Sequence, residues 1–96
     1  MADIFDVIAD ATRRELLQLL LDASLRGDGG TGELSVSELV ERMDATQPTV
    51  SKHLKVLRDH GLVTVRDEGQ HRYYTVDSAP LEEVEDWIIP FLSADF

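Results

Sequence analysis

Apolar residues recur at helical spacing between Thr46 and His60, in the middle of the chain. Val50, Leu54 and Leu57 fall at positions i, i+4 and i+7, so they share one face of a predicted helix. The outward face carries short polar and basic side chains: Gln47, Ser51, Lys52 and Lys55. Thr46 can cap the first turn and a glycine follows His60, so the sequence marks both ends of this helix.

A shorter helix is predicted over residues 35–43, just before the first. Ser35 and Glu38 match the S-x-x-E capping box, which satisfies free amides at a helix start. Its apolar stripe consists of Val36, Leu39, Val40 and Met43. Only residues 44 and 45 separate the two helices, and the second is basic on its outer face. The pattern indicates a helix-turn-helix over about residues 35–60, whose second helix enters the major groove of DNA.

Two β-prone runs follow, at residues 62–66 and 71–76, with a polar turn between them. They predict a hairpin over about residues 62–76, which is the wing of a winged helix-turn-helix. Residues 33–35 predict a short strand beside it. The expected fold is therefore mainly α-helical with a small β-hairpin wing.

A leucine-rich helix is predicted over residues 11–22, capped by Asp10, and its apolar residues run nearly all round it, as in a central core helix. Arg13 and Arg14 lie in its first turn, where they can touch phosphates or pair with nearby carboxylates. The next segment, residues 26–33, holds four of the six glycines and predicts a surface loop. It lacks the lysine beside serine or threonine that a phosphate-binding loop needs.

Helices are also predicted near both ends of the chain, at about residues 3–9 and 80–92. They carry more apolar surface than so small a domain needs. The residues expected on this surface are Ile4, Phe5, Ile8, Leu81, Val84, Trp87, Ile88 and Phe91. We expect them to join two chains in a homodimer; the alternative is that both helices fold back on their own core. Pro90 should end or kink the last helix.

The size and composition of the chain fit one domain, residues 1–96. The absence of cysteine excludes disulfides, thiolate metal sites and cysteine nucleophiles. No apolar run is long enough to span a membrane, and the first residues lack the pattern of a signal peptide. We therefore expect a soluble, cytoplasmic protein without membrane contact.

The formal net charge of −10 argues against a nucleic-acid ligand when the chain is taken as a whole. The charges of its three segments, taken separately, give a different result. Residues 1–45 carry four basic and ten acidic groups, and residues 75–96 carry none and six. Residues 46–74 carry five basic and three acidic groups, so the middle of the chain is its only basic part. Because salt screens charges beyond about 8–10 Å, this patch can hold DNA phosphates despite the acidic body. The acidic surface fits either a concentrated-salt cytoplasm or an ordinary soluble protein.

No metal site, cofactor or catalytic site is expected. His53, His60 and His71 lack the i, i+3 or i+4 spacing of paired ligands. There is no recognisable Ser-His-acid set, and the chain is too short for a deep pocket. The sequence therefore does not predict an enzyme.

Three segments together resemble the ArsR/SmtB family of dimeric winged-helix repressors: IADATRRELLQLL, TQPTVSKHLKVLRDHGLV and a hairpin ending in YYTV. The resemblance runs from about Phe5 to Phe91 and implies a homodimer. Many members sense metals through a Cys-x-Cys at the start of the third helix, but Ser35 and Ser37 stand there in this chain. A second family site pairs Asp and His along the last helix, which has no histidine here. The wing tip, residues 67–70, also lacks the basic residues common in the family.

We therefore expect a sequence-specific transcriptional regulator, a repressor that binds a pseudo-palindromic operator in double-stranded DNA as a dimer, and not a Cys-type metal sensor. DNA contacts are predicted for Gln47, Thr49, Ser51, Lys52, His53, Lys55, Arg66 and Arg72. Gln47 is the candidate for base readout, because an amide can make two bonds to adenine. A packing role for His53 and a cross-strand ion pair for Arg72 stay open. The rival hypothesis is an acidic winged-helix module that docks a protein partner, and the sequence points to no effector.

Overall fold

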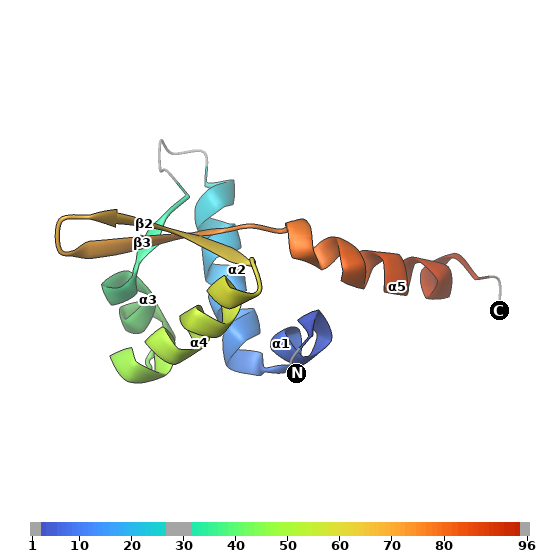
Figure 1. Cartoon of the computed structure of the whole chain (residues 1–96), viewed down its shortest axis with the longest axis horizontal. Helices are drawn as coiled ribbons and strands as arrows, with labels where there is room; N and C mark the ends of the chain where they lie inside the picture. Colours follow the sequence, from blue (N-terminus) through green and yellow to red (C-terminus); the bar gives the residue numbers. More distant parts are fainter. Residues whose placement is uncertain (1–2, 27–31, 95–96) are drawn as a thin grey trace.

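Helix α2 (Ala11–Leu25) runs through the centre of the molecule, and the other elements are arranged around it (Figure 1). The computed structural model describes residues 3–26 and 32–94. Leu16 and Leu20 on α2 are fully buried, which confirms the predicted core helix. Leu21 and Leu25 face solvent, so its leucines exceed what the core can cover.

Helices α3 (Val36–Met43) and α4 (Gln47–Asp59) form the predicted helix-turn-helix. The Ser35 hydroxyl accepts a hydrogen bond from the Glu38 N–H, and the Glu38 carboxylate accepts one from the Ser35 N–H. This reciprocal pair is the capping box expected from the sequence. Asp44 turns the chain between the helices with a φ of 52°, in the left-handed region that aspartate tolerates better than most residues.

The wing belongs to a three-stranded antiparallel sheet in the order β1-β3-β2. Strands β2 (Val63–Glu68) and β3 (His71–Val76) form the predicted hairpin. Gly69 lies at its tip with a φ of 63°, which a residue with a side chain rarely adopts. Strand β1 (Leu34–Ser35) pairs with β3, so the short strand expected before α3 is present. The fold is a winged helix-turn-helix, as predicted.

The hydrophobic core joins the helices to one face of the sheet. Val50, Leu54 and Leu57, predicted to share one face of α4, are all fully buried. The other core residues are Ile4, Val7, Leu16, Leu20, Ala23, Leu34, Leu39, Leu62, Val63 and Tyr74. Because the inner face of α4 is packed in this way, its polar face is held outward.

Helix α1 (Ile4–Ala9) packs against α2 and contributes to the core. Ile4 is only 5% exposed and Val7 is fully buried. Ile4 was expected on a surface that pairs two chains; the structure corrects this, because its side chain lies in the core of its own chain. Phe5 and Ile8 are half-buried.

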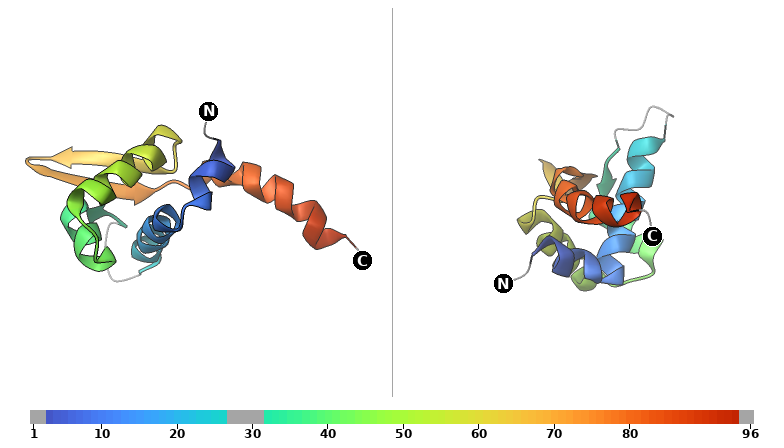
Figure 2. Two further views of the ribbon diagram at one scale, coloured as in Figure 1. Left: turned by 90° about the horizontal axis from the view of Figure 1, so that it is seen from below. Right: turned by 90° about the vertical axis from the view of Figure 1, so that its right-hand side faces the viewer.

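Helix α5 (Glu82–Ser93) follows a short 3-10 turn at Ala79–Leu81 and projects away from the body (Figures 1 and 2). None of its residues is buried. It meets α1 where the rings of Phe5 and Trp87 pack edge to face, with centroids 5.7 Å apart. The projecting helix extends the chain, whose radius of gyration of 14.7 Å exceeds the roughly 12.5 Å expected at this length.

Pro90 does not end the last helix, which continues to Ser93, so that part of the prediction was wrong. Proline has no N–H, so the carbonyl of Asp86, four residues earlier, loses its helical partner. Asp86 is exposed, so water can take the place of that hydrogen bond.

Most of the glycine-rich segment lies outside the described residues, at 27–31, so the predicted loop remains a prediction. In the part of the chain that the structure describes, no helix is long and apolar enough to cross a membrane.

Candidate nucleic-acid interface

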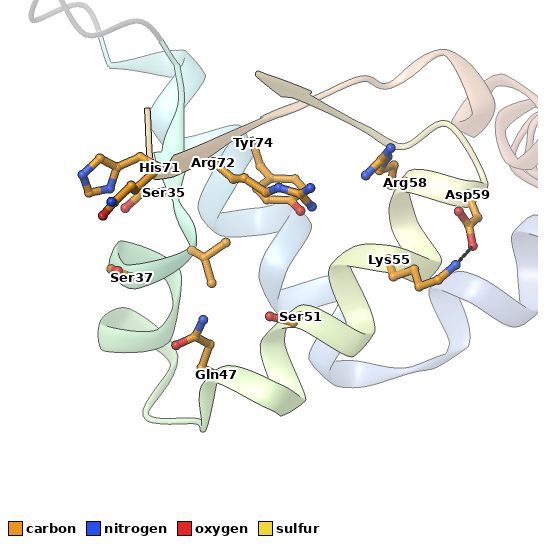
Figure 3. A pocket seen from close by; sticks show the side chains of 12 residues that line it. Ser35, Ser37, Gln47, Ser51, Lys55, Arg58, Asp59, His71, Arg72 and Tyr74 are labelled. Carbon is orange, nitrogen blue, oxygen red and sulfur yellow. Dashed lines mark hydrogen bonds and ion pairs between the residues drawn. The ribbon is translucent and has the colours of Figure 1, made fainter. Parts of the chain in front are cut away.

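A polar groove with a volume of about 660 Å³ lies between helix α4, the start of α3 and the wing (Figure 3). Its lining residues are Ser35, Val36, Ser37, Gln47, Ser51, Lys55, Arg58, Asp59, Gln70, His71, Arg72 and Tyr74. Hydroxyl, amide and cationic side chains dominate this lining. They are the groups that contact phosphates and base edges, so the groove is suited to a polyanion.

One stripe of α4 faces this α4–wing groove. Its members are Gln47, Ser51, Lys55 and Arg58, spaced i, i+4, i+8 and i+11, and all four are exposed. The first three were among the predicted DNA contacts, but Arg58 was missed. The signal was present in the sequence, because Arg58 continues the same helical spacing.

Lys55 carries an ion pair within the groove, since its Nζ lies 2.9 Å from Oδ2 of Asp59. The hydrogen bond from Lys55 lowers the pKa of Asp59. The two side chains are 76% and 55% exposed, so water and salt screen this pair strongly. A DNA phosphate can therefore take the place of the carboxylate.

Thr49 and Lys52 are exposed on α4 but lie outside the groove lining. The Thr46 hydroxyl donates to the Thr49 hydroxyl at 2.9 Å and accepts from the Thr49 N–H at 3.4 Å, as the predicted helix cap. No hydrogen bond or ion pair joins the exposed Lys52 side chain to another described residue. Its charge is therefore available to a ligand.

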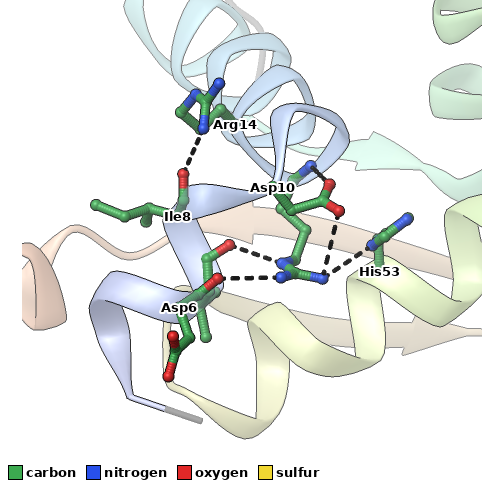
Figure 4. A network of polar contacts seen from close by, with 7 residues as sticks. Asp6, Ile8, Asp10, Arg14 and His53 are labelled. Carbon is green, nitrogen blue, oxygen red and sulfur yellow. Dashed lines mark hydrogen bonds and ion pairs between the residues drawn. The ribbon is translucent and has the colours of Figure 1, made fainter.

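His53 points toward helix α1 and the start of α2 (Figure 4). Its Nδ1 lies 3.3 Å from Nη1 of Arg13, and the side chain is half-buried. His53 was predicted as a DNA contact, with a packing role as the alternative. Its position favours the alternative, in which the ring supports the outward-facing residues of α4 from behind.

Arg13 and Arg14 bind the end of α1. Arg13 donates to the carbonyl of Val7 at 2.7 Å, and Arg14 donates to the carbonyl of Ile8 at 2.7 Å. Arg13 also lies 3.9 Å from the Asp10 carboxylate. This contact is the ion pair that the sequence offered as the alternative to a phosphate contact. Both guanidinium groups satisfy carbonyls that a helix end leaves without partners.

Arg66 is held by carboxylates of its own chain. Its Nε and Nη2 donate to Glu33 at 2.8 and 3.1 Å, and its Nη1 donates to Glu68 at 2.6 Å. The guanidinium also lies 4.9 Å from the centroid of the Tyr73 ring. These carboxylates, Glu33 first, raise the pKa of Arg66. Arg66 was predicted to contact DNA, but its geometry is that of a clamp between the wing and Glu33, the residue just before β1.

Arg72 lines the groove and pairs across the wing. Its Nε lies 3.1 Å from Oδ1 of Asp67, which is its partner in the strand register. The side chains are 56% and 64% exposed. The cross-strand ion pair left open by the sequence is therefore present, and it stands at a position that a phosphate can approach.

Metal ligands do not cluster in the described ranges, 3–26 and 32–94: no three His, Asp or Glu side chains there are placed to share an ion. Ser35 and Ser37, which occupy the places of the family's cysteines, line the groove with hydroxyl groups.

A winged helix-turn-helix with an exposed polar and basic second helix defines a class of DNA-binding proteins. Residues 8–66 match the family described as a helix-turn-helix domain. The arsenical resistance operon repressor of Staphylococcus aureus is 33% identical over 84 residues, which cover 88% of this chain and 72% of that protein. The transcriptional repressor SdpR of Bacillus subtilis is 27% identical over 93 residues, covering 97% of this chain and 93% of SdpR.

Solved structures give the same result. The crystal structure of a possible transcriptional regulator for arsenical resistance has a TM-score of 0.77 and 34% identity, covering 98% of this chain and 88% of that one. Reduced HlyU from Vibrio cholerae has a TM-score of 0.67 and 31% identity, covering 95% and 86%. The chain belongs to the ArsR/SmtB family of winged helix-turn-helix transcriptional regulators, and its function is that of a DNA-binding regulator.

Proposed function

We propose that two copies of this chain pair through α5 and bind a pseudo-palindromic operator in the cytoplasm to repress transcription. The observation that carries the proposal is the uncovered apolar face of α5 on a chain whose DNA-facing helix is already complete. Pairing through α5 would present two copies of α4 to one duplex, as two-fold symmetric operators require.

The apolar face of α5 supports the pairing. Trp87 is 57% exposed, Phe91 55% and Leu92 78%, although they lie on one short helix. Such a concentration of large apolar groups is unusual on the surface of a chain that stays single. The proposed pairing surface consists of Phe5, Ile8, Leu81, Val84, Trp87, Ile88 and Phe91 from the prediction, without Ile4 and with the exposed Ile89 and Leu92 added.

The exposed face of α4 supports the DNA contacts. Gln47 would read bases, because its amide can pair with adenine, and Ser51 and Thr49 would contact bases or phosphates beside it. Lys52, Lys55 and the newly identified Arg58 would hold the DNA backbone, since all three are exposed. Arg66 is left out of this set because Glu33 and Glu68 already bind its guanidinium.

The geometry of the proposed dimer sets the expected operator. The two recognition helices would enter successive major grooves, with half-sites about 10–10.5 bp apart. Selection of bound DNA from a random pool tests this directly. We expect an inverted repeat with that spacing. Recovery of single half-sites bound by one chain each, or of no preferred sequence, would contradict the proposal.

A matched pair of leucine substitutions tests the pairing surface. Leu92 on α5 is 78% exposed and Leu25 on α2 is 72% exposed, so an aspartate at either position should leave the fold intact. Sedimentation equilibrium should show Leu92→Asp as a monomer and Leu25→Asp as a dimer, and only Leu92→Asp should lose tight operator binding. The Leu25→Asp variant controls for the added negative charge.

The interaction-module alternative is not favoured, because the relatives are transcriptional repressors and regulators with the same domain. One experimental result would support this alternative. A protein of that kind would fail to recover any sequence from the random pool at low salt. We propose no catalytic role, cofactor or effector.

A further inference from the structure

The guanidinium of Arg13 on α2 contacts both α1 and α4, between Asp6 and His53, which are labelled in Figure 4. Its Nε donates to the Val7 carbonyl at 2.7 Å and its Nη2 to the Asp6 carbonyl at 3.2 Å, both on α1. Its Nη1 lies 3.3 Å from Nδ1 of His53 on α4 and 3.9 Å from the Asp10 carboxylate. Only 17% of the Arg13 side chain is exposed, so water competes little for these contacts.

We propose that the contact between Arg13 and uncharged His53 positions α4 for DNA, so that protonation of His53 weakens operator binding. The inference rests on the proposed DNA-binding role of α4. Arg13 and His53 act through that helix, as positioning residues.

The chemistry of the contact requires a neutral imidazole. A guanidinium has only donors, so Nδ1 of His53 must accept the hydrogen bond and the ring proton must lie on Nε2. When a second proton binds, both ring nitrogens become donors, and Nδ1 no longer has a lone pair to offer. Two cations then face each other across 3.3 Å in a half-buried site, and the contact is lost.

The charged groups around His53 do not offset this loss. Arg13 and Asp10 face the ring from α2 and its cap, α1 contributes backbone carbonyls bound to Arg13, and the adjacent charged residue on α4 is Lys52. Asp10 attracts an imidazolium, but its oxygens already accept the Arg13 N–H at 3.1 Å and pair with the guanidinium. This attraction cannot restore the Nδ1 lone pair that accepts the hydrogen bond from Arg13.

The position of His53 explains why the contact affects DNA binding. His53 lies between Lys52, which faces solvent, and Leu54, which is fully buried. The packed leucine stripe anchors the inner face of α4, while the bond to Arg13 ties its side to α1 and α2. Losing that tie lets the helix turn or shift on an apolar contact that has no direction of its own.

The direction of the pH effect is diagnostic. A positive charge gained near a phosphate backbone normally strengthens DNA binding. A loss of affinity on acidification therefore cannot come from bulk electrostatics. It requires a positioning contact that the proton breaks.

The experiment uses fluorescence anisotropy with a labelled duplex that the wild-type protein recovers from a random pool, and with a random-sequence duplex. Affinities are measured between pH 8 and pH 5.5 at constant ionic strength, the range in which imidazoles titrate. We expect wild-type affinity for the selected duplex to fall about three- to tenfold on acidification, as the loss of one hydrogen bond implies. Affinity for the random duplex should fall less.

Two substitutions of similar size separate the hydrogen bond from the ring. The side-chain oxygen of His53→Gln can accept from Arg13 and does not titrate, so this variant should bind like the wild type at pH 8 and keep its affinity at pH 5.5. His53→Leu has no acceptor and should bind about three- to tenfold more weakly at both pH values. His71→Gln removes an imidazole that lines the groove and would gain a charge facing DNA, so this variant should show a fall at least as large as the wild type. Circular dichroism at each pH establishes that every variant compared is folded.

The outcomes are distinct. A fall in affinity that persists in His53→Gln, or wild-type affinity that is constant or rises at pH 5.5, overturns the inference while leaving the proposed function intact. Failure of the wild type to bind any duplex at pH 8 overturns both. Nitrogen-15 NMR of the free protein at pH 8 gives an independent readout: a proton on Nε2 supports the contact, and a proton on Nδ1 refutes it.

Discussion

Asp67 and Arg72 face one another across the wing, with Oδ1 of the aspartate 3.1 Å from Nε of the arginine. The pair is more than half exposed at both side chains, and Arg72 lines the α4–wing groove. The Asp67 carboxylate thus pairs with the Arg72 guanidinium, which a DNA phosphate would otherwise contact. The wing of this chain is therefore partly neutralised by its own sequence.

Removing that carboxylate should strengthen DNA binding. We expect Asp67→Asn to raise affinity for a selected duplex about two- to fivefold at low salt. A phosphate that binds Arg72 would then no longer have to displace the Asp67 carboxylate. The gain should shrink as salt rises. Glu83→Gln on α5 controls for the loss of one negative charge, and Asp67→Asn with Arg72→Ala should show no gain. A gain that survives the double substitution would assign the effect to another residue.

Lys52 and Gln47 should differ in what they contribute to binding. Lys52→Ala should weaken binding to all sequences alike and reduce the slope of log affinity against log salt by about one unit, since one phosphate contact is lost. Gln47→Ala should relax sequence preference instead, by about 1–3 kcal/mol at one base pair. Filter binding over a salt series measures both. Arg26→Ala, at the end of α2, is the charge-matched control, and equal effects of the two variants on random DNA would refute the division.

Arg66 should matter for stability more than for DNA. Arg66→Ala removes the clamp between Glu33 and the wing, so the midpoint of thermal unfolding should fall, while the folded protein should bind the selected duplex within about twofold of the wild type. Glu33→Gln should lower the midpoint in the same direction. Differential scanning calorimetry and anisotropy together make the measurement. A large loss of affinity with unchanged thermal stability would return Arg66 to the DNA contacts.

Asp10 should make stability depend on acid. Its N-cap bond from the Arg13 N–H, aided by the nearby charge of Arg13, holds the pKa of Asp10 below its ordinary value. A carboxyl whose pKa is lower in the folded chain stabilises it above the ordinary value of about 3.9, and this contribution is lost as pH falls through the folded pKa. Asp10→Ala should cost about 1 kcal/mol at pH 7.

The companion variant Asp10→Asn separates charge from capping. Asparagine keeps the acceptor, so Asp10→Asn should be less destabilised than Asp10→Ala at pH 7. Its difference from the wild type should shrink as pH falls through the lowered pKa of Asp10, where the carboxyl also becomes neutral. Urea unfolding at a series of pH values gives both results. Equal destabilisation by the two substitutions at pH 7 would show that the cap acceptor contributes nothing.

The sequence alone determined the helix-turn-helix and the wing. Three local features mark these elements: the capping box of Ser35 and Glu38, the N-cap Thr46 and the apolar spacing on α4. Each acts within three to seven residues, so it can be recognised in the sequence without knowing where the rest of the chain lies. The same spacing identified three of the five α4 residues that line the groove. Arg58 was missed although it obeys the same rule.

Only the tertiary structure decided which charged side chains already bind a partner in their own chain. Arg66 meets Glu33 across 33 positions of sequence, and Arg13 meets His53 across 40. It also placed Ile4 in the core and left α5 extended, although both terminal helices carry similar apolar stripes. Local patterns report which face of an element is polar, whereas the partner of a long side chain depends on how distant segments pack. That information exists only once the core has brought them together.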